Sequence, residues 1–190
     1  MLDMGTGGGE FLFSLRPLPD VTYATEGFKP NIKIAGKRLK PLGVKVIGIN
    51  DNNKLPFPDD YFELVINRHE SYDAKEVFRI LRTKGLFITE QVGGLNMLGL
   101  NRLLGANRDF RMKYWNLKYG VRELAKTGFK VIEKIEEFPH IRFYDSGAVV
   151  YFLKAVPWQI PDFSVKKYFN PLKNLHDKIQ KNGYIEVKGH

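Results

Sequence analysis

The stretch Leu2–Leu12, LDMGTGGGEFL, decides the fold of this chain. It begins with apolar residues, continues with an acid and four glycines within five residues, and ends in an apolar run. This order predicts the end of a strand, a tight turn and the start of a helix. Glycine has no Cβ and tolerates positive φ, so the backbone of such a turn can approach a ligand closely. The first N–H groups of the following helix lack partners within it and carry positive partial charge.

Three nucleotide-binding patterns compete for this turn. The dinucleotide fingerprint G-x-G-x-x-G needs glycine or alanine where the chain has Glu10. The P-loop pattern needs a lysine, and none follows these glycines. The pattern acid-x-Gly-x-Gly fits, and it resembles motif I of the class I S-adenosylmethionine-dependent methyltransferases. The resemblance implies that Asp3, Gly5, Thr6 and Gly7 hold the methionine end of that cofactor; a plain glycine turn before a helix is the alternative.

Length and composition favour one globular domain over residues 1–190. The chain is 43% hydrophobic and 13% aromatic, which is ordinary for such a domain. It contains no run of 18 apolar residues and does not begin like a signal peptide, so we expect a cytoplasmic protein without a membrane partner. It contains no cysteine, which excludes disulfides and cysteine-ligated metals, and we expect no metal site.

The net charge of +9 bears on the kind of substrate. A basic protein is suited to nucleic acid or anionic surfaces. The lysines are scattered through every segment rather than grouped in long runs, so general lysine enrichment explains the charge equally well. A small-molecule acceptor is therefore favoured, and RNA is the second candidate.

An acid ends the predicted second strand. Residues 21–25 form a short β-rich run that is followed by Glu26 and Gly27. In Rossmann-like sheets an acid at this place, about 20 residues after the glycine loop, binds ribose hydroxyls. The resemblance gives Glu26 and Gly27 the same role toward S-adenosylmethionine, whereas a solvated turn carboxylate is the simpler reading.

The resemblance continues through Asp51–Asn67, DNNKLPFPDDYFELVIN. It is similar to the methyltransferase run of an acid, three residues, Leu-Pro-Phe, a turn and Phe-Asp-Leu-Val. In that family the acid contacts the adenine amino group, which implies this role for Asp51 and places the backbone of Asn52 near the ring. A polar loop before a strand is the alternative.

The predicted fourth strand, residues 62–67, ends in Asn67, Arg68, His69 and Glu70. Ligands of doubly wound sheets lie beyond the carboxyl ends of the strands, so these residues are expected to face the transferred methyl group. Asn67 is the candidate cofactor contact. His69 is the candidate general base, because imidazole titrates near neutral pH, although it could equally order the loop. The chain lacks the Asn/Asp-Pro-Pro-Tyr/Phe motif of amino-group nucleic-acid methyltransferases, and without cysteine it cannot use the covalent cytosine-C5 mechanism.

The remaining periodicities predict further helices and strands of an α/β fold, and the resemblance implies a doubly wound, Rossmann-like, mostly parallel sheet of seven strands in the order 3-2-1-4-5-7-6. The periodicities predict helices over residues 71–82, 117–125 and 148–153 and strands over 86–92, 129–138 and 184–187. Insertions at about 95–116 and 139–183 are expected to form the substrate pocket. Their basic and aromatic residues include Arg102, Arg108, Arg111, Trp115 and Trp158.

Only Met1 and Leu2 precede the acid of the first strand, and the chain stops soon after the last predicted strand begins. We therefore expect a fragment, or a chain with an unusual start, and expect it to bind S-adenosylmethionine weakly. The favoured function is methyl transfer from S-adenosylmethionine, with S-adenosylhomocysteine as the product. A non-catalytic module that binds S-adenosylmethionine is the second hypothesis, and a nicotinamide-dependent oxidoreductase is the third.

Overall fold

The computed structural model describes residues 1–107 and 112–190. Arg108 and Arg111, expected near the substrate pocket, lie outside the described residues. The chain forms two compact units. The first unit contains Met1–Gln91 and Arg122–Val131, and the second contains Val92–Val121 and Ile132–His190. No helix in the described ranges is long and apolar enough to cross a membrane.

The first unit is built on a five-stranded sheet in the order β3-β2-β1-β4-β5, with every neighbouring pair parallel. The strands are β1 (Leu2–Met4), β2 (Tyr23–Glu26), β3 (Lys45–Gly48), β4 (Phe62–Arg68) and β5 (Leu81–Glu90). The chain first winds outward from β1 to β3 and then returns to the other side of β1 to form β4. The carboxyl ends of β1 and β4 therefore flank the point at which the strand order reverses, where such sheets bind ligands.

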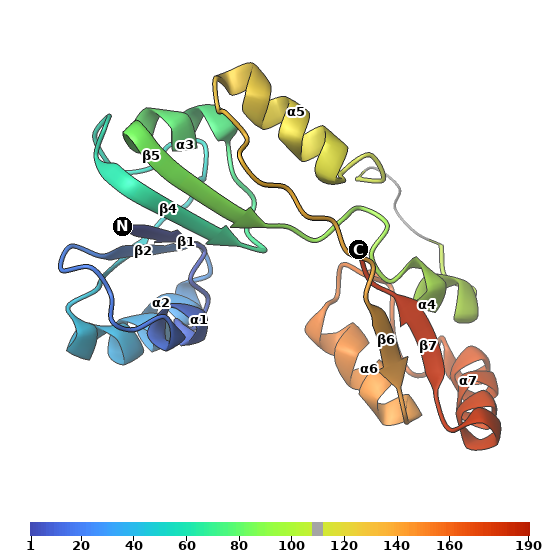
Figure 1. Ribbon diagram of the computed structural model, residues 1–190. Helices are drawn as coiled ribbons and strands as arrows, with labels where there is room; N and C mark the ends of the chain where they lie inside the picture. The colour runs from blue at the N-terminus through green and yellow to red at the C-terminus, as the bar shows by residue number, and fades with distance from the viewer. Residues whose placement is uncertain (108–111) are drawn as a thin grey trace. The chain divides into compact units, whose positions relative to one another are not determined.

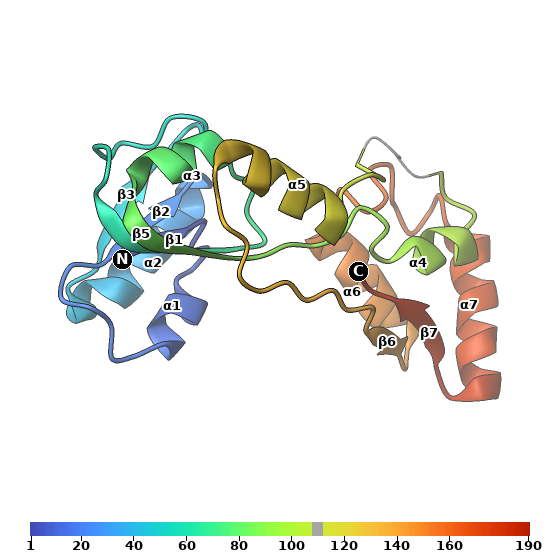
Figure 2. The same cartoon turned by 45° about the horizontal axis from the view of Figure 1, so that its top comes forward.

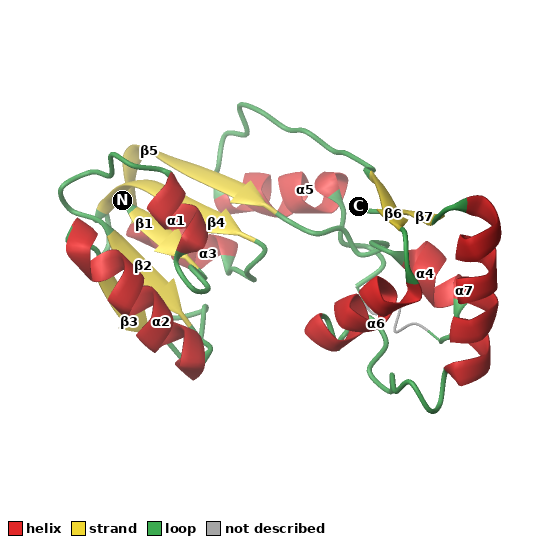
Figure 3. Ribbon diagram, turned by 90° about the horizontal axis from the view of Figure 1, so that it is seen from below, coloured by secondary structure: helices red, strands yellow, loops and turns green. Residues whose placement is uncertain are grey.

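Helices cover both faces of this sheet (Figure 1). One face carries α1 (Glu10–Ser14) and α2 (Lys29–Leu39), which lie side by side in Figure 3; a short 3₁₀ helix, η1 (Lys40–Leu42), follows α2. The other face carries α3 (Ala74–Ile80). Two apolar clusters fill the layers between sheet and helices, and their largest fully buried side chains are Leu2, Met4, Phe62 and Ile80 in one and Leu12 and Leu39 in the other.

The second unit has its own core around a two-stranded antiparallel sheet, in which β6 (His140–Phe143) pairs with β7 (Ile185–Lys188). Its helices are α4 (Leu98–Leu103), α6 (Ser146–Ala155) and α7 (Phe169–Asn182). Figure 2 shows α7 beside β7. Helix α5 (Leu117–Thr127) draws residues from both units. The buried side chains of this core include Met97, Leu100, Leu104, Leu153, Ile160 and Leu175.

The predicted seven-stranded order is wrong, because the structure has five parallel strands and a separate two-stranded sheet. Residues 129–138, predicted as the sixth strand, form no strand. Phe129 packs against Phe78 and Phe87 of the first unit, whereas Ile132 and Ile135 are 75% and 69% exposed. These two isoleucines are three residues apart, so a strand would turn them to opposite faces. The last predicted strand does form, but as β7 it pairs with β6 instead of joining the main sheet.

Aspartate caps fix the starts of two of the predicted helices. The helix predicted over 148–153 is confirmed as α6, and Asp145 caps it by accepting a hydrogen bond from the Ala148 N–H at 2.7 Å. The helix predicted over 71–82 is shorter. Asp73 caps its start by accepting from the N–H groups of Lys75 and Glu76, and the chain is already extended at Leu81, where β5 begins.

Candidate active site

Asp3 is a buried carboxylate in the middle of β1, with 3% of its surface exposed. Burial raises its pKa to about 6, and the nearby carboxylate of Glu26 adds to this rise. An ionised carboxylate in such a place is favoured when a positive charge lies next to it. Asp3, the acid of the acid-x-Gly-x-Gly pattern, is therefore suited to bind a positively charged group.

The glycine loop after β1 is tied to the end of β2. Gly7 donates its backbone N–H to Glu26 Oε2 at 2.7 Å, and Phe28 donates its own to Oε1 at 2.7 Å. Glu26 is 5% exposed, so these two bonds hold a buried carboxylate in one position. Each carboxylate oxygen has two lone pairs and can accept a further hydrogen bond, as the binding of ribose hydroxyls requires.

Arg38, from the last turn of α2, holds the same loop from the other side. Its guanidinium donates to the carbonyl oxygen of Gly8 and to the carboxylate of Glu10. The sequence pattern does not reveal this contact, because Arg38 lies 30 residues along the chain from Gly8. It belongs to α2, which precedes β3, and not to the helix that directly follows the glycine loop. The loop is thus fixed by one carboxylate and one guanidinium.

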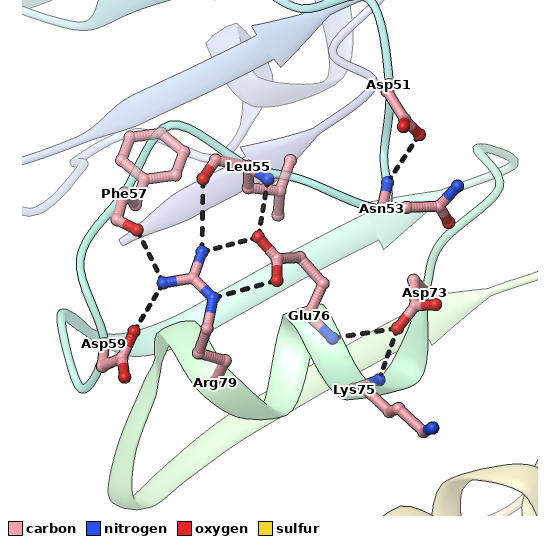
Figure 4. A network of polar contacts seen from close by, with 9 residues as sticks. All are labelled: Asp51, Asn53, Leu55, Phe57, Asp59, Asp73, Lys75, Glu76 and Arg79. Atoms are coloured by element: carbon pink, nitrogen blue, oxygen red, sulfur yellow. Dashed lines mark hydrogen bonds and ion pairs between the residues drawn. The ribbon is translucent and has the colours of Figure 1, made fainter.

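The loop after β3 contains the predicted adenine-side residues, Asp51 and Asn52. Arg79 and Glu76 of α3 organise the rest of this loop (Figure 4). Glu76 accepts the N–H of Leu55 at 2.6 Å, and Arg79 donates to the carbonyl oxygens of Leu55 and Phe57 at 3.2 and 2.8 Å. The carboxylate of Asp51 is exposed and accepts the N–H of Asn53 at 2.8 Å, so it orders the first turn of the loop.

Four buried polar atoms around the carboxyl ends of these strands have no hydrogen-bond partner within the described ranges. They are Thr6 Oγ1, Thr25 Oγ1, Asn52 Oδ1 and Asn67 Nδ2. Leaving a buried donor or acceptor unpaired costs about 1–3 kcal/mol, so a cluster of such groups indicates a place for a polar ligand. The residues present therefore fit a polar, positively charged nucleoside such as S-adenosylmethionine.

Gln91, directly after β5, connects this region to the loop after β4. Its side-chain amide donates to Asn67 Oδ1 at 2.7 Å, to Thr89 Oγ1 at 2.8 Å and to the carbonyl oxygen of Glu70 at 3.1 Å. The contacts orient the Asn67 amide, because its oxygen is used within the protein and its nitrogen is left for a ligand. A polar residue at the carboxyl end of the strand next to β4 is the signal that could have identified Gln91 beforehand.

His69 forms a dyad with Glu90. Its Nε2 lies 3.1 Å from Glu90 Oε1, and Arg68 donates to the other carboxylate oxygen at 3.0 Å. Partial burial opposes ionisation of Glu90, but the hydrogen bond from Arg68 and the neighbouring imidazole outweigh it and lower its pKa. His69 itself has φ of 61°, a left-handed conformation that non-glycine residues adopt at a cost. The backbone thus holds the imidazole in a specific direction.

A cavity of about 210 Å³ lies among these groups. It is lined by Asp3, Gly5, Thr6, Glu10, Phe11, Arg68 and His69. The structure therefore brings His69 to one cavity with three of the predicted methionine-side residues, Asp3, Gly5 and Thr6. The other predicted cofactor residues lie outside its lining: Gly7, Glu26, Gly27, Asp51, Asn52 and Asn67. A larger hollow of about 640 Å³ in the second unit is lined by none of the predicted site residues.

Comparison with known proteins agrees with this geometry. A family model described as a methyltransferase domain matches residues 2–89. The uncharacterised methyltransferase YcgJ of Bacillus subtilis is 23% identical over 143 residues, which are 66% of this chain and 56% of YcgJ. The chain thus aligns with little more than half the length of that relative.

Solved structures show the same fold. The crystal structure of YcgJ matches with a TM-score of 0.64 at 19% identity over 99% of this chain and 86% of that one. A SAM-dependent methyltransferase from Aquifex aeolicus matches with a TM-score of 0.51 at 19% identity over 70% and 72%. The [4+2]-cyclase SpnF matches with a TM-score of 0.57 at 15% identity over 100% and 74%. By motif, family match and fold, residues 2–89 of this chain are similar to the methyltransferase domain of class I S-adenosylmethionine-dependent methyltransferases.

Proposed function

We propose that this chain transfers a methyl group from S-adenosylmethionine to a small-molecule acceptor. The observation that carries the proposal is the buried Asp3 beside the glycine loop that Glu26 holds, together with the unpaired amide nitrogen of Asn67, which lies opposite Met4 on the neighbouring strand β4. When bound, S-adenosylmethionine supplies an electrophilic methyl group on a positively charged sulfur.

The residues divide the cofactor between them. Asp3 and the backbone of Gly5, Thr6 and Gly7 would hold the methionine end, and the free lone pairs of Glu26, with the adjacent Gly27, would hold the ribose. Asp51 and Asn52 would hold the adenine, and Asn67 would donate its unpaired N–H to the cofactor. The backbone contacts of Glu26, Arg38 and Arg79 fix these groups in advance, which lowers the entropy cost of binding.

His69 is proposed as the base that takes a proton from the acceptor. Glu90 lies within hydrogen-bond distance of Nε2 and so favours the tautomer that carries its proton there. Nδ1 is then the nitrogen that can accept a proton. The same dyad would stabilise the imidazolium that forms, because an ionised carboxylate lies next to it.

The cofactor proposal is tested by thermal melting with S-adenosylmethionine, S-adenosylhomocysteine and NADH. A ligand at 100 times its Kd stabilises the folded state by about 2.7 kcal/mol, which raises the Tm of a chain of this length by several degrees. We expect shifts with both adenosyl ligands, no shift with NADH, and loss of the shifts in Glu26→Ala. A shift with NADH alone would instead support an oxidoreductase.

The acceptor needs a second experiment. The cavity of about 210 Å³ beside His69 is suited to a small reacting group, whereas the net charge of +9 keeps RNA as the second candidate. Transfer of labelled methyl from S-adenosylmethionine to a cell extract is expected to appear in the small-molecule fraction and to survive ribonuclease treatment. Binding of the cofactor without transfer to any fraction would favour a non-catalytic module, and SpnF illustrates that this fold also occurs in a cyclase.

A further inference from the structure

Glu70 lies directly on the first glycine of the loop. A Cβ placed on Gly5 would be 2.4 Å from Glu70 Cβ and 2.9 Å from Glu70 Oε2, so the glutamate side chain occupies the space that a larger residue at position 5 would need. Its other oxygen, Oε1, accepts hydrogen bonds from Asn52 Nδ2 at 2.9 Å and from the N–H and hydroxyl of Ser71 at 3.2 Å each. The half-buried side chain thus spans from the glycine loop to the loop after β3.

The two oxygens of Glu70 differ in their surroundings. Oε1 is occupied by the contacts with Asn52 and Ser71, whereas no donor from residues 1–107 or 112–190 is bonded to Oε2, which lies at Gly5. The backbone of Glu70 is itself held by Gln91. One carboxylate oxygen is therefore held in place with a charge that no cation of the described chain neutralises.

This position matters because of how the cofactor is built. Its sulfur joins the adenosine part to the methionine part, and the proposed function places the adenine near Asn52 and the methionine end at Gly5. Glu70 bridges these two places. The sulfur is a cation in S-adenosylmethionine and is neutral in the product S-adenosylhomocysteine, so an anion at this point distinguishes the two by charge.

We propose that Glu70 is a specificity-determining residue that makes the site prefer S-adenosylmethionine over S-adenosylhomocysteine. The inference rests on the proposed function. The free carboxylate oxygen stabilises the sulfonium, and loss of the positive charge on methyl transfer removes that attraction and promotes release of the product. Asp3 and Glu26 hold other parts of the cofactor that do not change charge in the reaction.

The test is calorimetric titration of both ligands into the wild-type chain and into Glu70→Gln. Glutamine keeps the size of the side chain and an oxygen for Asn52, but it removes the charge. We expect the Kd for S-adenosylmethionine to rise about tenfold and the Kd for S-adenosylhomocysteine to change less than about twofold. Glu70→Asp, which retains the charge, is expected to keep a preference for S-adenosylmethionine.

Glu63→Gln is the matched control, because it changes the net charge by the same amount at the opposite end of β4. Its ratio of the two Kd values is expected to equal that of the wild type. Equal weakening of both ligands in Glu70→Gln would overturn the proposal in favour of a structural role, and tighter binding of both would show that Glu70 obstructs the site. If the wild-type chain binds neither ligand, the proposed function fails first, which separates the two conclusions.

Discussion

The ionisation of Asp3 couples the site to the stability of the fold. Burial raises the pKa of this carboxyl in the folded state to about 6, above its unfolded value near 3.8, so the folded chain holds the proton more tightly. Its contribution to stability is therefore fully present below about pH 4 and is lost as the pH rises to about 6. The full difference corresponds to about 3 kcal/mol.

Asp3→Asn isolates this effect. We expect the variant to be more stable than the wild type to urea at pH 7, by up to about 3 kcal/mol, and the difference to shrink toward pH 4. Its affinity for S-adenosylmethionine should fall, because the ionised carboxylate is what attracts the cationic ligand. A stability difference that does not depend on pH would contradict the assignment of the titration to Asp3.

Gly5 and Gly43 provide a matched pair for the glycine loop, with φ of 68° and 72°. An alanine at Gly43 meets no atom within 4 Å, so it should cost only the left-handed strain of about 1–2 kcal/mol. An alanine at Gly5 adds a contact of 2.4 Å with Glu70 Cβ and must displace that side chain. We expect Gly5→Ala to unfold at a lower urea concentration than Gly43→Ala and to bind S-adenosylmethionine more weakly; equal midpoints would show that the Glu70 loop moves freely.

His69 is expected to act on the chemical step rather than on cofactor binding. If it is the base, His69→Gln should reduce methyl transfer by a factor of about 10²–10⁴, the usual contribution of a general base. The Kd for S-adenosylmethionine, measured by titration, should stay close to that of the wild type. Loss of binding together with activity would instead support a role in ordering the loop.

At the scale of single elements, α3 organises the loop after β3 through Arg79. This guanidinium is bonded to the carboxylates of Glu76 and Asp59 and to two backbone carbonyls, and the hydrogen bond from Arg79 is the main cause that lowers the pKa of Glu76. The folded pKa of Glu76 lies below its unfolded value, so this stabilisation is present above about pH 4.5 and is lost as the pH falls through the folded pKa.

We expect Arg79→Ala to lower the free energy of unfolding by about 3 kcal/mol at pH 7, because it leaves the poorly exposed Glu76 and two carbonyls without their partner. Lys126→Ala is the matched control: it removes an exposed ion pair with Glu123 and should cost less than about 0.5 kcal/mol. Urea unfolding of both variants checks this. Equal losses would mean that the loop does not depend on the network.

At the scale of elements, features set by a local sequence pattern could be predicted, whereas features that depend on contacts between distant residues could not. The glycine turn, the acid at the end of β2 and the polar end of β4 are local patterns, and each appears where predicted. Arg38 acts on a residue 30 positions away, so no local pattern reveals it. The pairing of β7 with β6 was missed for the same reason, since the choice between two possible neighbours depends on packing in the second unit.

At the scale of the whole molecule, the single domain predicted for residues 1–190 remains a proposal, which α5 can test. The first unit and the second unit have separate buried cores, yet α5 is one helix that contributes residues to both. Unfolding either unit would therefore free one end of α5 and weaken the other unit. For this reason we expect the chain to unfold as one cooperative body.

Leu153→Ala tests that expectation, because Leu153 lies in the core of the second unit and is 2% exposed. The substitution should cost about 2–5 kcal/mol, as large-to-small changes in cores do. Amide hydrogen exchange reports each unit separately. In one cooperative body the slowest amides of β1 and β4 lose as much protection as those of α6 and α7, whereas loss confined to α6 and α7 would establish two domains that unfold independently.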